Sequence, residues 1–493
     1  MKNYIDIPLF TSFNEIINKN YTLSATQYKS FNIKNKNIKP VSAFLYRDLK
    51  REDLGCEVGT DAYVDISSCY FIKTKALQPE FYLINGNSES IQRIVPKSLV
   101  SSDLKKGDII ISKDSNVGEI AILEKDYPNT MLCGGIYKLP VIKNKYYLLA
   151  FIKSEVFRQQ IDFLVPRGST IRHGKKKFLE CLIPMPNKNT NDTIKYVECL
   201  MQAIINKEIK IKEKYSECAN LIENELKNNQ KQIKFTYSLP NIQELVNNDR
   251  MDTKIYSEEY KSTHFLINNY TNGTFTIPYK NIFGGNTPQK RVISEDDALD
   301  YFWVTPTIFS DLGMLTSKNT INCNTTNIKN NTLFIVNRTS KGGEGKFVGM
   351  SYFYNVKDLG EGQYNQGLYG IRNYSDEDLY FLNALINSPL YRILFSKLSM
   401  GSKMKEIKMK QVAELIFPNF PTDVKKRIVS LYHNEKSIYD SCNCSLDIFL
   451  DYDNEFNMQA GIYELDKSMK VLQQKLNMAI QNIADDKEVE IQF

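Results

Sequence analysis

The sequence predicts an α+β protein made of two similar units, each rich in short strands with a few short helices and each followed by a long helical segment. Two observations lead to this prediction. Landmarks recur in order along the 493-residue chain, and two long segments carry apolar residues at helical spacing. The helical segments are expected to form an antiparallel coiled coil, which would relate the two units by an approximate two-fold axis.

The repeat is visible as matched landmarks in the two halves of the chain. The pairs are NEIIN at 14–18 with QELVN at 243–247, TLSATQY ending at Tyr28 with RMDTKIY ending at Tyr256, LCGGIYKL at 132–139 with YNQGLYGI at 364–371, Gly168 with Gly401, and Pro184 with Pro418. The separations lie between 228 and 234 residues and the order is the same in both halves. The chain therefore consists of two diverged copies of one unit.

The globular parts are predicted from strand and turn patterns. GDIIISKDSNVGEIAIL at 107–123 reads as a β-branched strand, a turn and a second strand, and residues 331–356 repeat the pattern around a glycine-rich turn. Short helices are expected at 146–161 and 377–395. The expected boundaries are 1–188 and 235–420 for the two globular domains, with helical segments at 189–234 and 421–493.

The long helices are predicted from apolar seams. The first helix, capped by Asn191 or Asp192, carries Val197, Met201, Ile204, Ile211, Tyr215, Cys218 and Ile222, and only Glu208 interrupts the seam. A second helix, capped by Thr422, is expected to carry Val424, Ile428, Leu431, Ile438 and Cys442. A further segment places Ile462, Leu465, Met469, Leu472, Leu476, Ala479 and Ile483 at heptad spacing. The alternative is that each helix packs only on its own globular domain.

Composition excludes several classes of protein. A hydrophobic fraction of 42% is ordinary for a soluble protein, and no apolar run reaches the roughly 18 to 20 residues that span a bilayer. The N-terminal MKNYIDIPLF lacks the apolar core of a signal peptide, so a cytoplasmic protein without membrane contact is expected. The net charge of +6, from 63 basic and 57 acidic residues, permits a polyanionic partner without requiring one.

The cysteines give no framework for a metal site. There are nine, without a CxxC pair, and only Cys442 and Cys444 approach the spacing of two ligands. A structural zinc site needs about four ligands. Free thiols are therefore the prediction, and no metal is expected.

Motifs for catalysis are also missing. The loop SKGGEGKF at 340–347 resembles a phosphate-binding loop, but Ser340 and Phe347 stand where a Walker motif needs Gly and Ser or Thr, so a hairpin turn is predicted. The three histidines lie outside any HExxH motif or nucleophile elbow. An adenine methyltransferase tetrapeptide of the Asn-Pro-Pro-Tyr kind is absent as well. The sequence thus predicts a protein without catalytic activity of its own.

Basic and hydroxyl side chains gather in loops at corresponding places of the two copies. The first set comprises Lys113, Ser115, Lys138, Arg167, Ser169, Thr170, Arg172, His173, Lys175, Lys176 and Lys177. The second comprises Arg338, Ser340, Lys341, Lys346, Ser402, Lys403, Lys405, Lys408 and Lys410. Such groups bind phosphates and read base edges, although the same composition also suits a solvated loop. Because the cluster occurs twice, DNA binding is the favoured interpretation.

At this point the sequence resembles a known family, the specificity subunits of type I restriction-modification systems. The passages that carry the resemblance are LKKGDIIISKDSNVGEIAIL, RMDTKIYSEEY at 250–260, and the pair RGSTIRHGKKKFLECLIPMP and MGSKMKEIKMKQVAELIFPNFP. The resemblance covers nearly the whole chain. The first copy departs from the pattern with TLSATQY in place of RMDTKIY, and the second copy lacks the Gly-Asp strand opening at 107–108.

The resemblance implies a non-catalytic subunit whose two target-recognition domains each read one half of a bipartite target in double-stranded DNA, with the paired helices as a spacer. It implies two methyltransferase subunits and further restriction subunits as partners. S-adenosylmethionine, ATP and magnesium would then be bound by those partners and not by this chain. Three alternatives remain open: a recognition subunit of a related modification or phage-defence system, a duplicated-domain enzyme, and a coiled-coil adaptor that binds only proteins.

Overall fold

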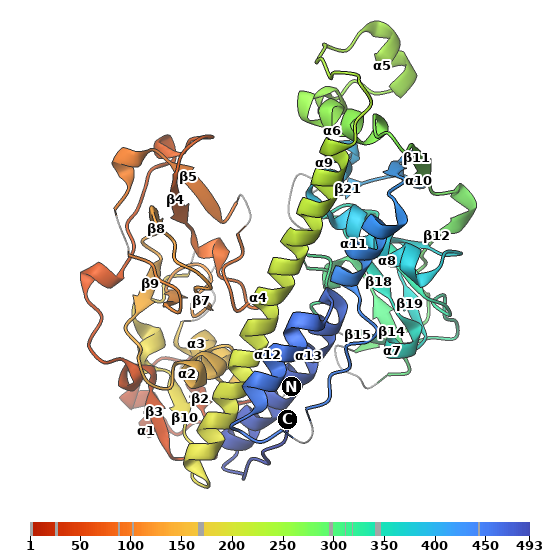
Figure 1. The fold of residues 1–493 in the computed structure, drawn as a ribbon. Helices are drawn as coiled ribbons and strands as arrows, with labels where there is room; N and C mark the ends of the chain where they lie inside the picture. The colour runs from red at the N-terminus through yellow and green to blue at the C-terminus, as the bar shows by residue number, and fades with distance from the viewer. Residues whose placement is uncertain are drawn as a thin grey trace. The chain divides into compact units, whose positions relative to one another are not determined.

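The computed structural model describes residues 3–493 except 25–27, 87–88, 101–102, 166–171, 295–298, 311, 318, 341–346 and 442–443. The fold is mixed α+β, with two β-rich regions separated by long helices, as the sequence predicts (Figure 1). The chain divides into two compact units. Unit 1 comprises Met1–Lys210, Ile438–Gln459 and Leu465–Phe493, and unit 2 comprises Ile211–Ser437 and Ala460–Glu464.

Within its described residues, unit 1 contains ten short strands and the helices around them. The strands are β1 (Ile5–Asp6), β2 (Ser30–Phe31), β3 (Ile38–Pro40), β4 (Cys69–Ile72), β5 (Ile91–Ile94), β6 (Ile109–Ser112), β7 (Ile120–Ile122), β8 (Thr130–Leu132), β9 (Ile136–Leu139) and β10 (Leu182–Pro184) in the described part of the chain. The helices are α1 (Phe13–Asn18), α2 (Lys145–Ile152), α3 (Glu155–Leu164), the first half of α4 (Thr190–Asn228), α12 (Phe449–Gln459) and most of α13 (Ile462–Ala484).

Unit 2 has the same kinds of element. Its described strands are β11 (Thr274–Thr276), β12 (Ile282–Gly284), β13 (Val292–Ser294), β14 (Tyr301–Val304), β15 (Asn319–Asn322), β16 (Thr332–Val336), β17 (Arg338–Thr339), β18 (Ser351–Tyr354), β19 (Gly362–Tyr364), β20 (Leu368–Ile371), β21 (Lys405–Glu406) and β22 (Ile416–Pro418). Its helices are the second half of α4, α5 (Ile242–Asn248), α6 (Glu258–Asn268), α7 (Val356–Leu359), α8 (Asp376–Asn387), α9 (Pro389–Leu398), α10 (Met409–Glu414) and α11 (Thr422–Tyr432).

The two units share their strand topology, which supports the duplication. In unit 1, β6 lies between β7 and β9, and in unit 2, β16 lies between β18 and β20. A second sheet pairs β4 with β8 in parallel and with β5 in antiparallel, and β14 pairs in the same way with β19 and β15. The β3–β10 pair of unit 1 likewise corresponds to the β11–β22 pair of unit 2. The proline-ended segments that precede a helix in each copy of the repeat, β10 and β22, are thus the last strands of their units.

The predicted short helices at 146–161 and 377–395 are each divided in two by a serine. Ser154 separates α2 from α3, and Ser388 separates α8 from α9. Each hydroxyl donates a hydrogen bond of 2.6 Å to the carbonyl three residues earlier, at Phe151 and Leu385. Serine hydroxyls that bond to nearby backbone compete with helix continuation, which explains both interruptions.

In unit 1, α4 packs against α13, as the predicted seams of these two helices require, and also against α12 (Figure 1). The side chains of Val197, Met201 and Ile204 are fully buried in one cluster with Leu472, Leu476 and Ile483, among others. Tyr196, near the start of α4, and Asn482, near the end of α13, line the same pocket. Further along α4, Glu208 accepts a hydrogen bond from the backbone N–H of Tyr82, whose side chain bonds to Gln473 near the middle of α13. Residue numbers therefore rise along α4 as they fall along the adjacent α13. The predicted antiparallel pairing of these two helices is confirmed.

The C-terminal region differs from the prediction of a helix running from Thr422 past Ile438. Helix α11 ends at Tyr432. Its N-cap position is held by Pro421, which makes no capping hydrogen bond, and Thr422 is the first helical residue. Ile438 is exposed outside any helix. The segment after Tyr432 is rich in Asn, Ser and Asp, whose side chains favour turns over helix. The predicted position Cys442 lies outside the described residues. The α12 helix, which no seam in the sequence indicated, follows this segment.

A glycine between α12 and α13 allows the chain to return to unit 2. A Cβ on Gly461 would lie 2.7 Å from the backbone of Tyr432 and of His433, closer than atoms can approach. The same turn brings Glu464 to His433, whose imidazole bonds to the Glu464 carboxylate and stacks on Tyr380 with ring centroids 4.4 Å apart. Gly461 is therefore required for the contact between His433 and Glu464.

We expect the stability of unit 2 to fall as the pH rises above neutrality. Burial alone would lower the pKa of His433, but its hydrogen bond to Glu464 and the charges of Glu464 and Glu435 outweigh burial and raise it. A raised pKa in the folded state adds stability that is complete below the unfolded value of about 6.5 and is lost as the pH passes the folded pKa. Urea unfolding between about pH 6 and about pH 9 should show this loss. The variant His433→Gln should lack it; a parallel decline in both proteins would contradict this assignment.

Candidate nucleic-acid interface

In unit 1, the loop after the central strand β6 is joined to the basic segment that follows α3. Asp114 and His173 form an antiparallel bridge, and their side chains lie 2.9 Å apart. The N–H of Gly174 donates to the carbonyl of Lys113 at 2.6 Å, and the N–H of Ser115 donates to the carbonyl of Arg172 at 2.8 Å. Residues 113–115 and 172–174 thus form one connected surface, although they are far apart in the sequence.

Unit 2 repeats this arrangement at the corresponding place. Arg338 and Thr339, which follow the central strand β16, form strand β17, and β17 pairs antiparallel with Lys405 and Glu406 of β21. Met400 and Glu406 close a loop through reciprocal backbone hydrogen bonds of 2.8 Å. In each unit the Gly-Ser passage is therefore followed by a segment that bonds to the end of the central strand.

The loop closed by Met400 and Glu406 in unit 2 requires a glycine at position 401. Gly401 adopts a φ of +107°, and a Cβ there would lie 2.1 Å from the carbonyl oxygen of Met404. Only glycine fits both conditions. The loop leaves Ser402 and Lys403 exposed to solvent at its tip.

A third loop lies against the first two in each unit. The N–H of Lys113 donates to the carbonyl of Gly135 at 2.8 Å, and the N–H of Asn337 donates to the carbonyl of Gly367 at 2.9 Å. Gly135 and Gly367 are a matched pair in the sequence repeat. Three segments of chain therefore converge at the same point of both units.

Some of the basic side chains of unit 1 are hydrogen-bonded or ion-paired within the unit. The Arg172 guanidinium donates to Asp162 at 2.8 Å and to the carbonyl of Val165, and it is only 14% exposed. Lys138 donates to Asp108 at 2.7 Å and to the carbonyl of Asp103 at 2.9 Å, near the start of β6 and not near the converging loops. Both side chains are thus already engaged within the unit.

The three lysines after His173 differ in whether their side chains have a partner within the unit. Lys176 donates to the carbonyl of Leu49 at 3.1 Å, and Lys177 forms an ion pair with Glu180 at 2.9 Å. Lys175 is exposed at a φ of +48° and makes no side-chain hydrogen bond or ion pair within the described part of the chain. Lys113 pairs with Asp114, its neighbour. Lys175 is therefore the group of this set that is most available to a ligand, and His173 is largely exposed although its ring contacts Asp114.

In unit 2 the exposed Lys403 and Ser402 at the loop tip have no side-chain partner among the described residues, and Ser340 is also exposed. Lys405 donates to the carbonyl of Gly401, and Lys410 pairs with Glu414 at 3.6 Å. The half-buried Arg338 lies near Tyr369: burial and Glu406 raise the pKa of the Tyr369 phenol, and the charge of Arg338 opposes them. Lys408 is exposed at the N-cap position of α10.

Five predicted site residues lie outside the described residues. They are Arg167, Ser169, Thr170, Lys341 and Lys346. Each falls in a segment adjacent in sequence to the converging loops, since 172–174 follows the first group and 338–340 precedes the second.

The structure adds one candidate side chain, Gln366, that the charge pattern did not indicate. Gln366 is exposed next to the converging Gly367, and its amide oxygen accepts a hydrogen bond from the hydroxyl of Thr287. Glutamine amides pair with adenine through two hydrogen bonds, so Gln366 suits base reading as well as the lysines suit phosphate binding. The signal available in the sequence was the matched glycine pair, which marks this loop in both copies.

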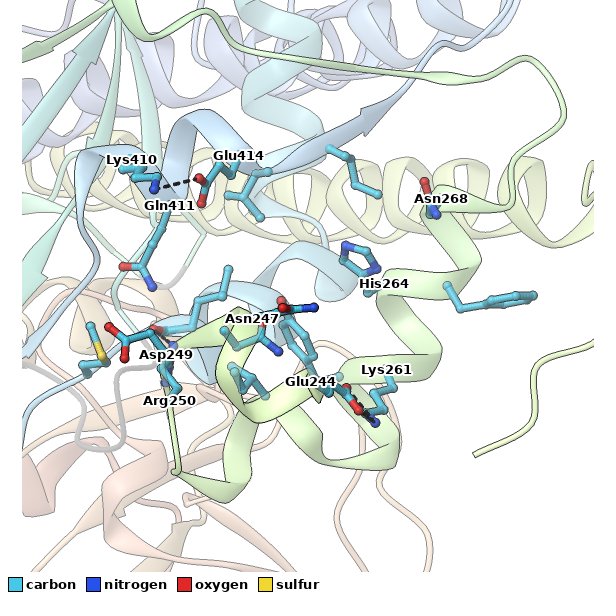
Figure 2. Close-up of a pocket in the computed structure, with 18 of the residues that line it drawn as sticks. Glu244, Asn247, Asp249, Arg250, Lys261, His264, Asn268, Lys410, Gln411 and Glu414 are labelled. Carbon is cyan, nitrogen blue, oxygen red and sulfur yellow. Dashed lines mark hydrogen bonds and ion pairs between the residues drawn. The ribbon is translucent and has the colours of Figure 1, made fainter. Parts of the chain in front are cut away.

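A polar cavity of about 1000 Å³ adjoins the basic segment of unit 2 (Figure 2). Figure 2 shows its walls, formed by α5, α6 and α10, and Lys408 and Lys410 are among the lining residues. Its charged groups are largely paired with one another: Lys261 with Glu244 at 2.8 Å, and Lys410 with Glu414. The cavity therefore suits a polar group more than an apolar ligand.

Within the described ranges, no group of three or more His, Cys, Asp and Glu side chains is arranged to hold a metal ion. The eight described cysteines are free thiols, and burial raises the pKa of Cys133, beside the third loop, to about 11. This thiol is protonated at neutral pH. None of the helices that the structure describes combines the length and the apolar character needed to cross a bilayer.

No protein-family model and no curated protein matches the chain. Several solved structures match over most of its length. A chain from a study of complex assembly and conformational transition of the type I R-M system has 14% identity over 92% of this chain and 98% of its own, with a TM-score of 0.27.

Two further matches are similar in extent. The HsdS subunit from Thermoanaerobacter tengcongensis has 13% identity over 91% of this chain and 96% of its own, with a TM-score of 0.26. The S subunit of a type I restriction-modification system from M. genitalium has 15% identity over 91% and 96%, with a TM-score of 0.33. These three structures, each of which matches more than 90% of this chain, come from type I restriction-modification systems.

Proposed function

We propose that this chain is the DNA-binding specificity subunit of a type I restriction-modification system and has no catalytic activity of its own. One observation carries the proposal. In both copies of a duplicated unit, the end of the central strand is bonded to a basic segment after the Gly-Ser passage, at Lys113 with Gly174 and at β17 with β21. A surface that is kept at the same place in two diverged copies suits a ligand with two similar halves.

The chemistry of these surfaces suits duplex DNA. Lysine side chains without an internal partner, such as Lys175 and Lys403, can bind phosphates and orient the protein, while hydroxyl and amide groups such as Ser402 and Gln366 can contact base edges. Each unit has its own core and its own loops. Each unit would therefore read one half of a bipartite target, with α4 and α13 as the spacer.

The remaining parts of the reaction would belong to partner proteins. Two methyltransferase subunits would bind S-adenosylmethionine and modify adenine in each half-site, and restriction subunits would supply ATP- and magnesium-dependent cleavage. This chain would bring them to DNA. A recognition subunit of a related modification system would have the same surfaces, and the neighbouring genes would distinguish the two.

The direct test is to sequence methylated adenines in the source genome and in a strain that lacks this gene. The proposal predicts a bipartite methylated motif, with two specified parts and an unspecified gap of fixed length, that disappears in the deletion strain. An unchanged methylation pattern would contradict the proposal. A protein that binds only other proteins would also show no salt-dependent affinity for DNA.

Exchange of one unit should alter only one half of the motif. We expect a chimera in which residues 1–186 are replaced by the matching domain of a relative to methylate a motif whose second half-site is unchanged. The physical reason is that each set of converging loops is bonded within its own unit. Sequencing the methylated sites of the chimera measures this. A change in both half-sites would show that the units do not read independently.

A further inference from the structure

The apolar seam of α4 contains one buried carboxylate. Glu208 lies on the buried face between Ile204 and Ile211, and only 6% of it is exposed. Its two oxygens accept hydrogen bonds from the backbone N–H groups of Tyr82 at 2.8 Å and Leu83 at 3.3 Å. An ionised carboxylate is costly to bury unless such partners are present. The contact is therefore satisfied only where the 82–83 segment meets one particular turn of α4.

Further buried charges surround this contact. The Lys153 side chain, 5% exposed, lies 3.5 Å from Glu119, which also binds Arg158. Burial lowers the pKa of Lys153, and the charges of Glu119 and Glu208 oppose this effect. The carboxylate of Glu208 therefore belongs to a cluster of opposite charges that links α4 to the globular part of unit 1.

The segment held by Glu208 is connected by hydrogen bonds to the candidate DNA-binding loop. The carbonyl of Tyr82 accepts a hydrogen bond of 2.9 Å from Ile122 of β7. Strand β7 pairs with β6, and β6 ends immediately before Lys113. In addition, the side chain of Asn116 donates to the carbonyl of Leu77 at 3.0 Å. The position of the 82–83 segment along α4 thus determines the position of the converging loops along α4.

We propose that Glu208 is a positioning residue that fixes the reading loops of unit 1 at one height along α4 and so limits the target to one gap length. This inference rests on the proposed function. An apolar seam alone allows packing in more than one register, whereas a buried polar group specifies a single one. Helix α4 begins in unit 1 and continues into unit 2. Under the proposed function α4 is part of the spacer between the two half-sites, so the height along α4 at which the unit 1 loops are held would set the gap.

The size of the expected change follows from helix geometry. A slip of one helical turn along α4 moves the loops by about 5.4 Å. At a rise of about 3.4 Å per base pair, this distance corresponds to one or two base pairs. Loss of the Glu208 contact should therefore add methylated motifs whose gap is one or two base pairs longer or shorter, with unchanged half-sites.

The test compares Glu208→Leu, which completes the apolar seam, with Glu208→Gln, which keeps an oxygen that can accept from Tyr82. Glu217→Gln, at an exposed position of the same helix, is the matched control. Each variant is expressed with its partner subunits in a strain that lacks the gene, and the gap lengths of methylated motifs are sequenced. Hydrogen exchange at the Tyr82 and Leu83 amides reports whether the contact has been lost. Glu208→Ala replaces the leucine variant if that variant does not fold.

We expect one gap length for the wild type, Glu217→Gln and Glu208→Gln, and additional gap lengths for Glu208→Leu together with faster exchange at Tyr82 and Leu83. A single, unchanged gap in Glu208→Leu despite faster exchange would overturn the inference while leaving the proposed function intact. Absence of any bipartite motif with the wild-type chain would instead overturn the proposed function.

Discussion

Replacement of Lys175, Lys176 and Lys177 by alanine should weaken DNA binding and reduce its dependence on salt. Each lost phosphate contact lowers the slope of log affinity against log salt by roughly 0.9, so the affinity deficit changes about three- to fourfold per contact over a fourfold range of salt. Lys176 and Lys177 are bonded to Leu49 and Glu180, whereas Lys175 has no side-chain partner among the described residues. The single variant Lys175→Ala should therefore reproduce most of the effect.

The measurement is binding of the assembled methyltransferase to cognate and scrambled duplexes at several salt concentrations. The matching replacement of Lys403, Lys405 and Lys408 should weaken the contact of the other unit in the same way. Lys138→Ala is the matched control, because Lys138 is bonded to Asp108 and Asp103 away from the converging loops. Equal loss on both duplexes would identify phosphate contacts, and loss on the cognate duplex alone would identify base reading. An unchanged slope in both triple variants would mean that these lysines are ordinary solvated surface.

The largest stability effect is expected at a buried ion pair between α4 and α12. Lys207 and Asp453 are both fully buried, with 2.7 Å between the Lys207 nitrogen and a carboxylate oxygen, and Lys207 also donates to Asn457 at 2.8 Å. Burial lowers the pKa of Lys207, and Asp453 opposes this shift. Asp453→Ala leaves the ammonium group without its counter-charge and should lower the free energy of unfolding by about 3 to 5 kcal/mol.

A double variant that removes both charges distinguishes the effect of the ion pair from that of side-chain packing. The double variant Lys207→Met with Asp453→Leu removes both charges and should stay close to the wild type or exceed it in stability. Glu223→Ala breaks an exposed pair with Lys227 on the same helix and should change the stability by less than about 0.5 kcal/mol. Urea titration gives the free energies, and hydrogen exchange in α12 locates the loss. If Asp453→Ala changed the free energy of unfolding as little as Glu223→Ala, the Lys207–Asp453 pair would be accessible to water and not buried as described.

The elements predicted correctly are those whose signal is local or repeated. The seam of α4 gives a strong helical period over many turns, and its members Val197, Met201 and Ile222 are all buried as the period requires. The paired landmarks located the Gly135 and Gly367 loops, which meet the candidate surfaces in both units. The breaks at Ser154 and Ser388 and the end of α11 at Tyr432 were missed, because side-chain bonds and tertiary contacts override the apolar period there.

The candidate site could be located by composition but not resolved into its working groups. Arg172 and Lys138 have the same chemistry as Lys175 in the sequence, yet Asp162 and Asp108 bind the first two. Such pairing depends on contacts between distant residues, which a charge pattern does not reveal. Gln366 was missed for the opposite reason, since an uncharged side chain in a loop gives no pattern until the loop is placed beside Arg338 and its neighbours.

The division of unit 1 into separate stretches has a consequence for synthesis on the ribosome. Its globular part is made first, but its core includes Phe449, Leu472 and Phe493. At about 5 to 20 residues per second, roughly 15 to 60 s separate the emergence of Lys210 from that of the last of these residues. During this interval the buried face of α4 has no α13 to cover it, whereas unit 2 can complete its core earlier. The unit that starts first therefore finishes last, and its nascent form exposes apolar surface for longer than that of unit 2.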